Sequence, residues 1–175
     1  KSKYSKTVKK FFNQSTDLDD SMSSLNTAFS KEGVYIHIPK NIVVKKPVEI
    51  IHFCTGNKAA LMLQPRNLIV VEENSEIEII ESHQSLTVNP IFTNSVTEIF
   101  AQKNSNIVSY KIQTDVVNSS LIDNTYISQK RNSDVKVHTF SFGGKITRNN
   151  LNFFQKNESI NSTMKGLTII DFNQL

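Results

Sequence analysis

An Asn-Ser dipeptide returns along this sequence at the start of one apolar run after another. It occurs at Asn74-Ser75, Asn94-Ser95, Asn104-Ser105, Asn118-Ser119 and Asn132-Ser133, and Asn157-Glu158 is a near variant. An apolar residue follows three positions after most of these asparagines, at Ile77, Ile107, Leu121, Val135 and Ile160, and two positions after Asn94, at Val96. Both side chains suit tight corners, because they bond to nearby backbone and Asn tolerates the left-handed conformation. Each dipeptide therefore predicts a corner, and each apolar run predicts a short strand.

The spacing of these corners favours a coiled chain over other all-β architectures. Apolar and polar residues alternate in SEIEIIES and SDVKVHTFSF, which predicts strands with one face turned inward. The corners recur at irregular intervals of 10 to 25 residues, which suits a β-helix better than a leucine-rich repeat or a propeller. An antiparallel sandwich is the alternative, but the hairpin dipeptides Asn-Gly and Asp-Gly are absent from the sequence. We predict a mainly β protein with a β-helix core over residues 34–175.

Residues 1–33 are predicted to form a short helical or irregular segment. Within SMSSLNTAFSKEG, Ser21 or Ser23 could cap a helix and Gly33 could end it. One face of this helix is expected to carry Leu25, Ala28 and Phe29.

The sequence ends in IIDFNQL, which contains no evident cap for a coil. Stacked coils leave open strand edges that natural solenoids cover or pair. We therefore expect further fold or a partner beyond Leu175, so that the core is truncated on its C-terminal side. An open edge also predicts a homodimer for the isolated chain.

The charge of the chain is modest, with a formal net charge of +4. Five lysines stand in the first ten positions: Lys1, Lys3, Lys6, Lys9 and Lys10. They predict a solvated helix face, and without a basic stripe carrying aromatic partners we expect no nucleic-acid binding. No apolar run approaches the roughly 20 residues of a membrane span, and no apolar segment follows the basic start as in a signal peptide. We therefore predict no membrane association.

Cys54 is the only cysteine, which excludes an internal disulfide and a zinc site made from several cysteines. A lone cysteine fits a reducing compartment, and the apolar setting IIHFCTG predicts a buried thiol. The histidines show no paired spacing, so we interpret them as surface residues and predict no metal site. They are His37, His52, His83 and His138.

The motifs of common enzyme sites are absent. The sequence contains no GxxxxGK[ST] loop, no GxSxG elbow and no HExxH. Paired carboxylates could indicate a β-helix polysaccharide lyase or hydrolase, but the glutamates of one run largely alternate and are interpreted as a solvated face. They are Glu72, Glu73, Glu76, Glu78 and Glu81. We predict no catalytic residue.

The segment SFGGKITRNN is the most individual stretch of the chain. Gly143 and Gly144 can adopt backbone angles that are closed to other residues, which predicts a corner. The guanidinium of Arg148 could brace neighbouring coils. The other interpretation is contact with a partner protein, through Gly143, Gly144, Arg148 and Asn150.

From this segment outward, the ordered set of motifs resembles the SufB/SufD family over roughly residues 23–175. The set runs LNTAFSKEGVYIHIPKN, PRNLIVVEENSEIEIIE, TNSVTEIFAQKNSNIVSYKIQ, SLIDNTYISQKRNSDVKVHTFSFGGKITRNNLNF and STMKGLTIID. The unbroken ENSEIEIIESHQSL and ISQKRNSDVKVHTFSFGG are more similar to SufD than to SufB.

The resemblance implies a right-handed parallel β-helix in a non-catalytic scaffold subunit of the SUF iron–sulfur cluster assembly machinery. Its implied partners are SufB-like and SufC-like proteins, and its implied location is the cytoplasm. The family's C-terminal region, with its late histidine and cysteine positions and its SufC-binding helices, has no counterpart here. We therefore expect no cofactor in this chain, an iron–sulfur cluster only in the full assembly, and no SufC binding. The competing hypothesis is a β-helix carbohydrate-active or adhesin-like protein.

Overall fold

The computed structural model describes residues 5–15, 20–55, 60–171 and 174–175. Two short helices, α1 (Ser5–Phe11) and α2 (Ser21–Phe29), precede two parallel sheets. Sheet A contains β1 (Tyr35–Ile38), β3 (Leu61–Leu63), β4 (Arg66–Val71), β6 (Ile91–Ala101), β8 (Ser119–Gln129) and β10 (Ile146–Gln155). Sheet B contains β2 (Val48–Cys54), β5 (Glu76–Ser85), β7 (Asn106–Gln113), β9 (Asp134–Ser141) and β11 (Asn161–Thr168).

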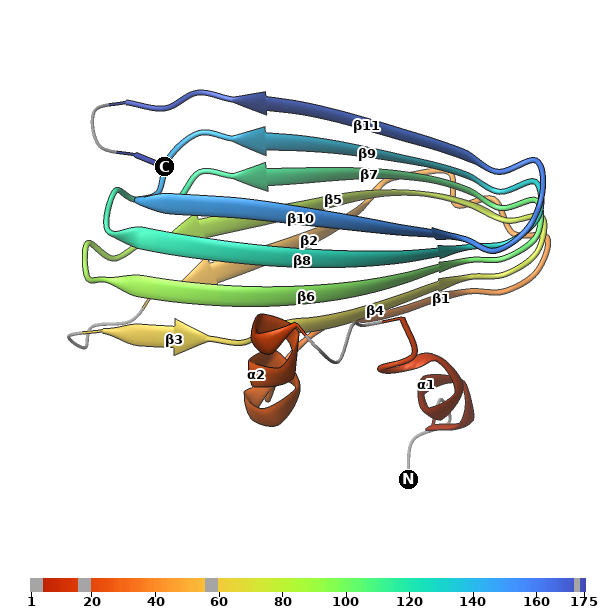
Figure 1. Cartoon of the computed structure of the whole chain (residues 1–175), viewed down its shortest axis with the longest axis horizontal. Helices are drawn as coiled ribbons and strands as arrows, with labels where there is room; N and C mark the ends of the chain where they lie inside the picture. The colour runs from red at the N-terminus through yellow and green to blue at the C-terminus, as the bar shows by residue number, and fades with distance from the viewer. Residues whose placement is uncertain (1–4, 16–19, 56–59, 172–173) are drawn as a thin grey trace.

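The two sheets are the two sides of one right-handed coil (Figure 1). The chain runs along sheet A, turns a corner, returns along sheet B and then enters sheet A one strand further on. Sheet A has the order β1-β4-β6-β8-β10 and sheet B the order β2-β5-β7-β9-β11, and every described strand pair is parallel. The predicted right-handed parallel β-helix, with a short helical segment before it, is confirmed.

Asparagines form the corner between the sheets at three of the predicted positions. Asn74, Asn104 and Asn132 each have a φ of 57°, in the left-handed region. Their side chains stack into a ladder in which Asn104 Nδ2 donates to Asn74 Oδ1 at 2.7 Å and Asn132 Nδ2 donates to Asn104 Oδ1 at 3.1 Å. Asn74 Nδ2 continues the ladder to Asn41. The corners therefore stack because the same residue type meets itself in successive coils.

The other predicted corners differ from this pattern. Asn94 lies inside β6 and is fully buried, where its amide donates to Met22 O and Gln64 Oε1. The prediction of a corner at Asn94 is therefore wrong. Asn118 precedes β8 without a positive φ, and after Asn157 it is Ser159 that has a φ of 56°.

The apolar core fills the coil next to the asparagine corner. Isoleucines stack in register on both sides of this core, as Ile69, Ile99 and Ile127 in sheet A and as Ile77 and Ile107, followed by Val135, in sheet B. Stacking of β-branched side chains on pleated surfaces removes them from water and supplies the main stabilisation of the coil.

Helix α2 differs from its prediction in its ends and in its buried face. Asp20 caps its start by accepting from Ser23 N, and Ser30 caps its end, so neither a serine at the start nor Gly33 at the end has the predicted role. Its buried residues are Ser23 and Asn26, whereas Phe29 of the expected apolar face is 56% exposed. The reason is that α2 packs on a polar part of sheet A.

Three hydrogen bonds show how α2 docks. Asn26 Nδ2 donates to Pro65 O at 2.9 Å and to Asn94 O at 2.8 Å, and Ser23 Oγ lies 2.8 Å from the hydroxyl of Tyr126. Polar residues are thus required on this helix face because buried carbonyl groups must be paired.

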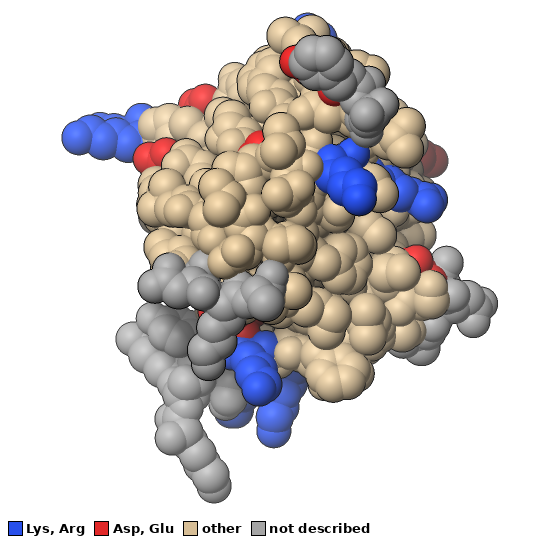
Figure 2. Space-filling view, turned by 90° about the vertical axis from the view of Figure 1, so that its left-hand side faces the viewer, with Lys and Arg blue, Asp and Glu red and all other residues tan. Residues whose placement is uncertain are grey.

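The described charged side chains gather in no stripe on the face shown in Figure 2, where Lys, Arg, Asp and Glu are scattered among uncharged residues. Lys6, Lys9 and Lys10 are exposed on α1, as predicted, whereas Lys1 and Lys3 lie outside the described residues. Among the described residues, none of the helices is long and apolar enough to span a membrane.

Candidate functional site

The interior of the coil, called the lumen here, becomes polar away from the asparagine corner. On β5 the inward positions run Ile77, Ile79, Glu81 and His83, and all four side chains are buried. The inward positions of β7 change in the same direction and reach Lys111. The second halves of β5 and β7 therefore carry charged groups into the lumen.

Glu81 is the centre of this polar lumen, with a side chain only 3% exposed. Its Oε1 accepts from Asn67 Nδ2 at 2.8 Å, and His52 Nε2 lies 3.1 Å from the same oxygen. Its Oε2 lies 3.2 Å from Lys111 Nζ. Because Asn67 is on sheet A and the other residues are on sheet B, these contacts cross the lumen.

A second carboxylate neutralises the lysine. Lys111 Nζ donates to Asp123 Oδ2 on β8 at 2.6 Å. Burial by itself would raise the pKa of Glu81, but the charge of Lys111 and the hydrogen bond from His52 outweigh it and hold this pKa well below its ordinary value. Burial would likewise lower the pKa of Lys111, yet the charges of Asp123 and Glu81 raise it. Glu81 and Lys111 are therefore both ionised at neutral pH.

Two histidines complete the site. His52 on β2 and His83 on β5 are register partners, and their rings stack with centroids 4.5 Å apart. His83 Nε2 lies 3.8 Å from Glu81 Oε1 and makes no hydrogen bond, although the residue is only 6% exposed. Burial lowers the pKa of His83, because desolvation penalises the charged ring. One ligand atom from each of His52, Glu81 and His83 lies within 4.8 Å of the other two.

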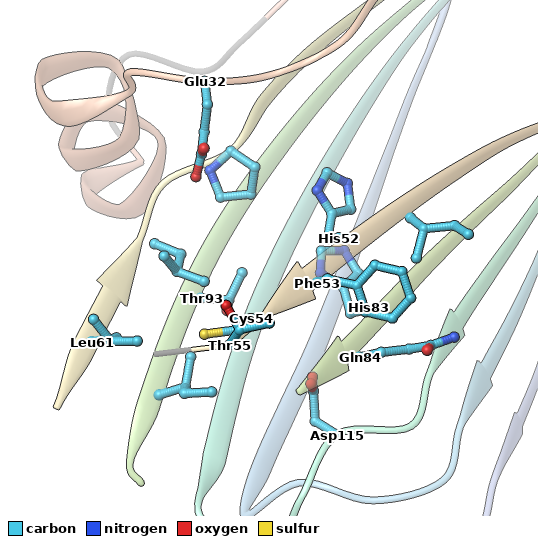
Figure 3. A pocket seen from close by; sticks show the side chains of 14 residues that line it. Glu32, His52, Phe53, Cys54, Thr55, Leu61, His83, Gln84, Thr93 and Asp115 are labelled. Atoms are coloured by element: carbon cyan, nitrogen blue, oxygen red, sulfur yellow. The ribbon is translucent and has the colours of Figure 1, made fainter. Parts of the chain in front are cut away.

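The two histidines line a cavity of about 390 Å³ (Figure 3). Cys54 on β2 lines the same cavity and is buried, as predicted. Thr93 and Asp115 contribute to other parts of the wall. The two imidazoles that line this cavity also lie close to the ionised carboxylate of Glu81, so the site can hold a small polar ligand or a cation.

The predicted glycine corner lies away from this cluster, between β9 and β10. Gly143 has a φ of 154° and Gly144 a φ of 76°. A Cβ added at Gly143 would overlap the carbonyl oxygen of Asp115. The corner prediction is confirmed, and close approach of the preceding coil explains why glycine is needed.

Arg148 and Asn150 lie on β10. Arg148 is exposed, and its Nε donates to Asn150 Oδ1 at 3.0 Å on the same strand. The predicted bracing of a neighbouring coil by Arg148 is therefore wrong. Asn150 instead makes the link between coils, because its Nδ2 donates to Asn124 Oδ1 at 2.6 Å. A role of these residues in partner contact stays a prediction.

The sequence prediction missed the lumen cluster. Glu81 is not on the solvated face, because it is two positions after Ile79 and four after Ile77 and so lies on the same inward face of β5. This alternation could have been read from the sequence. His83 is buried rather than on the surface. The surface interpretation holds for His37, which pairs with Glu72 at 3.0 Å outside the lumen.

His138 and the remaining glutamates of the run lie outside the lumen as well. His138 is partly exposed and stacks on Tyr110 at 5.1 Å. The glutamates that are exposed or partly exposed, as predicted, are Glu72, Glu73, Glu76 and Glu78.

The fold and the lumen define a parallel β-solenoid with a charged interior and helices packed on one outer face. Residues 53–175 match the family described as SUF system FeS cluster assembly, SufBD core domain, and residues 1–50 match the SufBD protein N-terminal region. The chain therefore belongs to the SufBD family.

Three relatives agree with this assignment. An iron–sulfur cluster assembly SufBD family protein of Synechocystis is 30% identical over 94% of this chain and 38% of its own length. The chloroplastic protein ABCI7 of Arabidopsis thaliana is 28% identical over 79% of this chain and 30% of its own. The iron–sulfur cluster assembly protein SufD of Bacillus subtilis is 27% identical over 76% of this chain and 31% of its own length. The chain thus spans less than two-fifths of these relatives, and no solved structure matches it significantly.

Proposed function

We propose that this chain is the central part of a non-catalytic scaffold subunit of the SUF iron–sulfur cluster assembly machinery. The full-length subunit acts through contacts with SufB-like and SufC-like proteins in the cytoplasm. The observation that carries the proposal is the match of residues 53–175 to the SufBD core domain, supported by a relative that is named SufD. Family membership favours this role over the carbohydrate-active or adhesin-like alternative. The cluster is cargo of the full assembly, and we assign no cluster ligand to this chain.

The last coil supports a role in protein–protein contact. In the described part of the chain, β10 and β11 are the end strands of their sheets. They expose apolar side chains, with Ile146 42%, Leu167 49% and Met164 59% accessible. Exposed apolar side chains of this kind suit contact with another protein surface.

Co-purification of the full-length parent with candidate SufB-like and SufC-like proteins tests the proposal. Size exclusion with light scattering should detect a complex of all three proteins. The 175-residue chain is the matched comparison, and we expect it not to retain the SufC-like protein. A full-length parent that elutes alone with both partners present would contradict the scaffold role. The same measurement on the isolated chain tests the predicted homodimer.

A further inference from the structure

We propose that His52, Glu81 and His83 bind one first-row divalent transition-metal ion inside the lumen. This site goes beyond the scaffold role and does not depend on it. Parallel pairing of β2 with β5 places His52 beside His83, and Glu81 lies two positions before His83 on the same inward face. The three ligand atoms already lie within 4.8 Å of one another.

The donor separations are close to those of a metal site. Bonds of about 2.0–2.1 Å to a tetrahedral ion place donor atoms about 3.3 Å apart. His52 Nε2 and His83 Nε2 lie 3.1 and 3.8 Å from Glu81 Oε1. The three ligand atoms are therefore close enough to share one ion, and the two rings, which are stacked at an interplanar angle of 14°, rotate on binding so that both nitrogen lone pairs point at it. When His52 Nε2 binds the ion, it loses its proton to solvent and Nδ1 takes up a proton from solvent. The imidazole therefore stays neutral.

The unpaired nitrogen of His83 points to a missing ligand. A buried polar atom without a partner costs free energy, and native interiors rarely retain one. His83 Nε2 is such an atom, in a residue 6% exposed, and it faces the carboxylate of Glu81. A metal ion between these groups would satisfy it.

The charge of the lumen suits a cation. With both imidazoles neutral, Glu81 and Asp123 contribute two negative charges and Lys111 one positive charge, which leaves a net charge of −1. Lys111 contacts Oε2 of Glu81 and the donor set uses Oε1, so the lysine and the ion occupy different oxygens. Asn67 also donates to Oε1 and fixes the carboxylate, as an outer-shell group does in metal sites.

The donor set indicates the class of ion. Imidazole nitrogens favour zinc, iron, nickel and copper over magnesium or calcium, which prefer oxygen ligands. Three protein ligands leave a further coordination position. His52 and His83 also line the cavity of about 390 Å³, which gives a small ligand room beside the proposed site.

Titration of the 175-residue chain with Co²⁺, followed by visible absorption, and with Zn²⁺, followed by calorimetry, tests the site. We expect one ion per chain, and we expect H52Q and H83Q each to weaken binding at least about tenfold. His37 forms a comparable His–Glu pair outside the lumen, so H37Q is the matched control and should bind as the wild type does. Circular dichroism establishes that each variant is folded.

Histidine side-chain NMR on the unaltered protein keeps the proposal testable if H83Q fails to fold. Zn²⁺ should shift the ring nitrogens of His52 and His83 and leave those of His37 and His138 in place. Absence of saturable binding at micromolar metal would overturn the proposal. Binding that survives in H52Q, or Zn²⁺ shifts confined to His37 and His138, would overturn it as well.

Discussion

Arg66 Nη2 donates to Glu98 Oε2 at 2.8 Å, and the two side chains are only 2% and 0% exposed. This pair lies on the outer face of sheet A, beneath the segment that follows α1. The backbone amides of Asn13, Gln14 and Ser15 also donate to the Glu98 carboxylate. One buried anion therefore binds both the neighbouring strand and the helical segment, and it holds that segment on the solenoid.

Glu98→Gln should destabilise the fold by about 3–5 kcal/mol, because it leaves the guanidinium of Arg66 buried without its counter-charge. Urea denaturation measures this loss, and limited proteolysis should cut the segment before Tyr35 first. Glu73→Gln is the control, because Glu73 pairs with Lys40 at the surface and should have little effect on stability. Equal loss in both variants would show that the buried pair has no special role.

Asn104→Ala should destabilise the coil by about 1 kcal/mol, because alanine is strained at a φ of 57° and the ladder loses two hydrogen bonds. Asn104→Gly removes the same bonds without the strain, so it should lose less. Urea midpoints compare both with Asn118→Ala, at an exposed asparagine without a positive φ. If Asn118→Ala costs as much as Asn104→Ala, the ladder does not explain the corner.

Gly143→Ala should destabilise the fold by about 3 kcal/mol or more, since the new methyl group overlaps the carbonyl of Asp115 in the preceding coil. Gly166→Ala is the matched change on β11, where the nearest atom is the hydroxyl of Thr139 at 3.0 Å. We expect it to be close to neutral. Thermal unfolding of the two variants distinguishes a required corner from a general intolerance of alanine.

The parts of the fold that depend on local chemistry could be predicted from the sequence. Asn74, Asn104 and Asn132 form corners because asparagine itself favours the left-handed conformation. Asn94 has the same neighbouring serine but lies within a strand, because α2 covers it and uses its amide and carbonyl as partners. A dipeptide motif does not indicate which distant segment packs on it, so this contact could not be predicted from Asn94-Ser95 alone.

The lumen site was only partly predictable, for a related reason. The parity of Glu81 with Ile77 shows that it faces inward. Its partners His52 and Lys111 are each about 30 residues away, and they meet Glu81 only because successive coils have nearly equal length. Coil length is a property of the whole turn, so sequence spacing alone does not indicate this convergence.

The cap of α2 should give stability a weak dependence on acid pH. Burial would raise the pKa of Asp20, but hydrogen bonds from Ser23, Met22 and Tyr126 together lower it. The pKa of Asp20 is lower in the folded state than its unfolded value of about 3.9, so the ionised carboxylate stabilises the fold above that pH. This stabilisation is lost as the pH falls through the folded pKa. Asp20→Asn retains a capping side chain, so its stability should differ from that of the wild type at pH 6 and converge with it towards pH 2. A constant difference from pH 6 to pH 2 would contradict this role.

Lys111→Met tests the charge balance of the lumen. It leaves the carboxylates of Glu81 and Asp123 buried without their shared cation, so the metal-free protein should lose about 3–5 kcal/mol of stability. The lumen would then hold two negative charges, which favours a divalent cation more strongly than the net charge of −1 in the wild type. Unfolding in Zn²⁺ and in EDTA should therefore show a larger stabilisation by Zn²⁺ in Lys111→Met than in the wild type.

The double variant with His52→Gln separates metal binding from a general effect of zinc. Removal of a proposed ligand should abolish the additional stabilisation by Zn²⁺ while leaving the loss caused by Lys111→Met in EDTA. Equal stabilisation by Zn²⁺ in the single and double variants would place the ion elsewhere. A stability loss in Lys111→Met that Zn²⁺ does not reduce would mean that the lysine balances the two carboxylates without any connection to a metal ion.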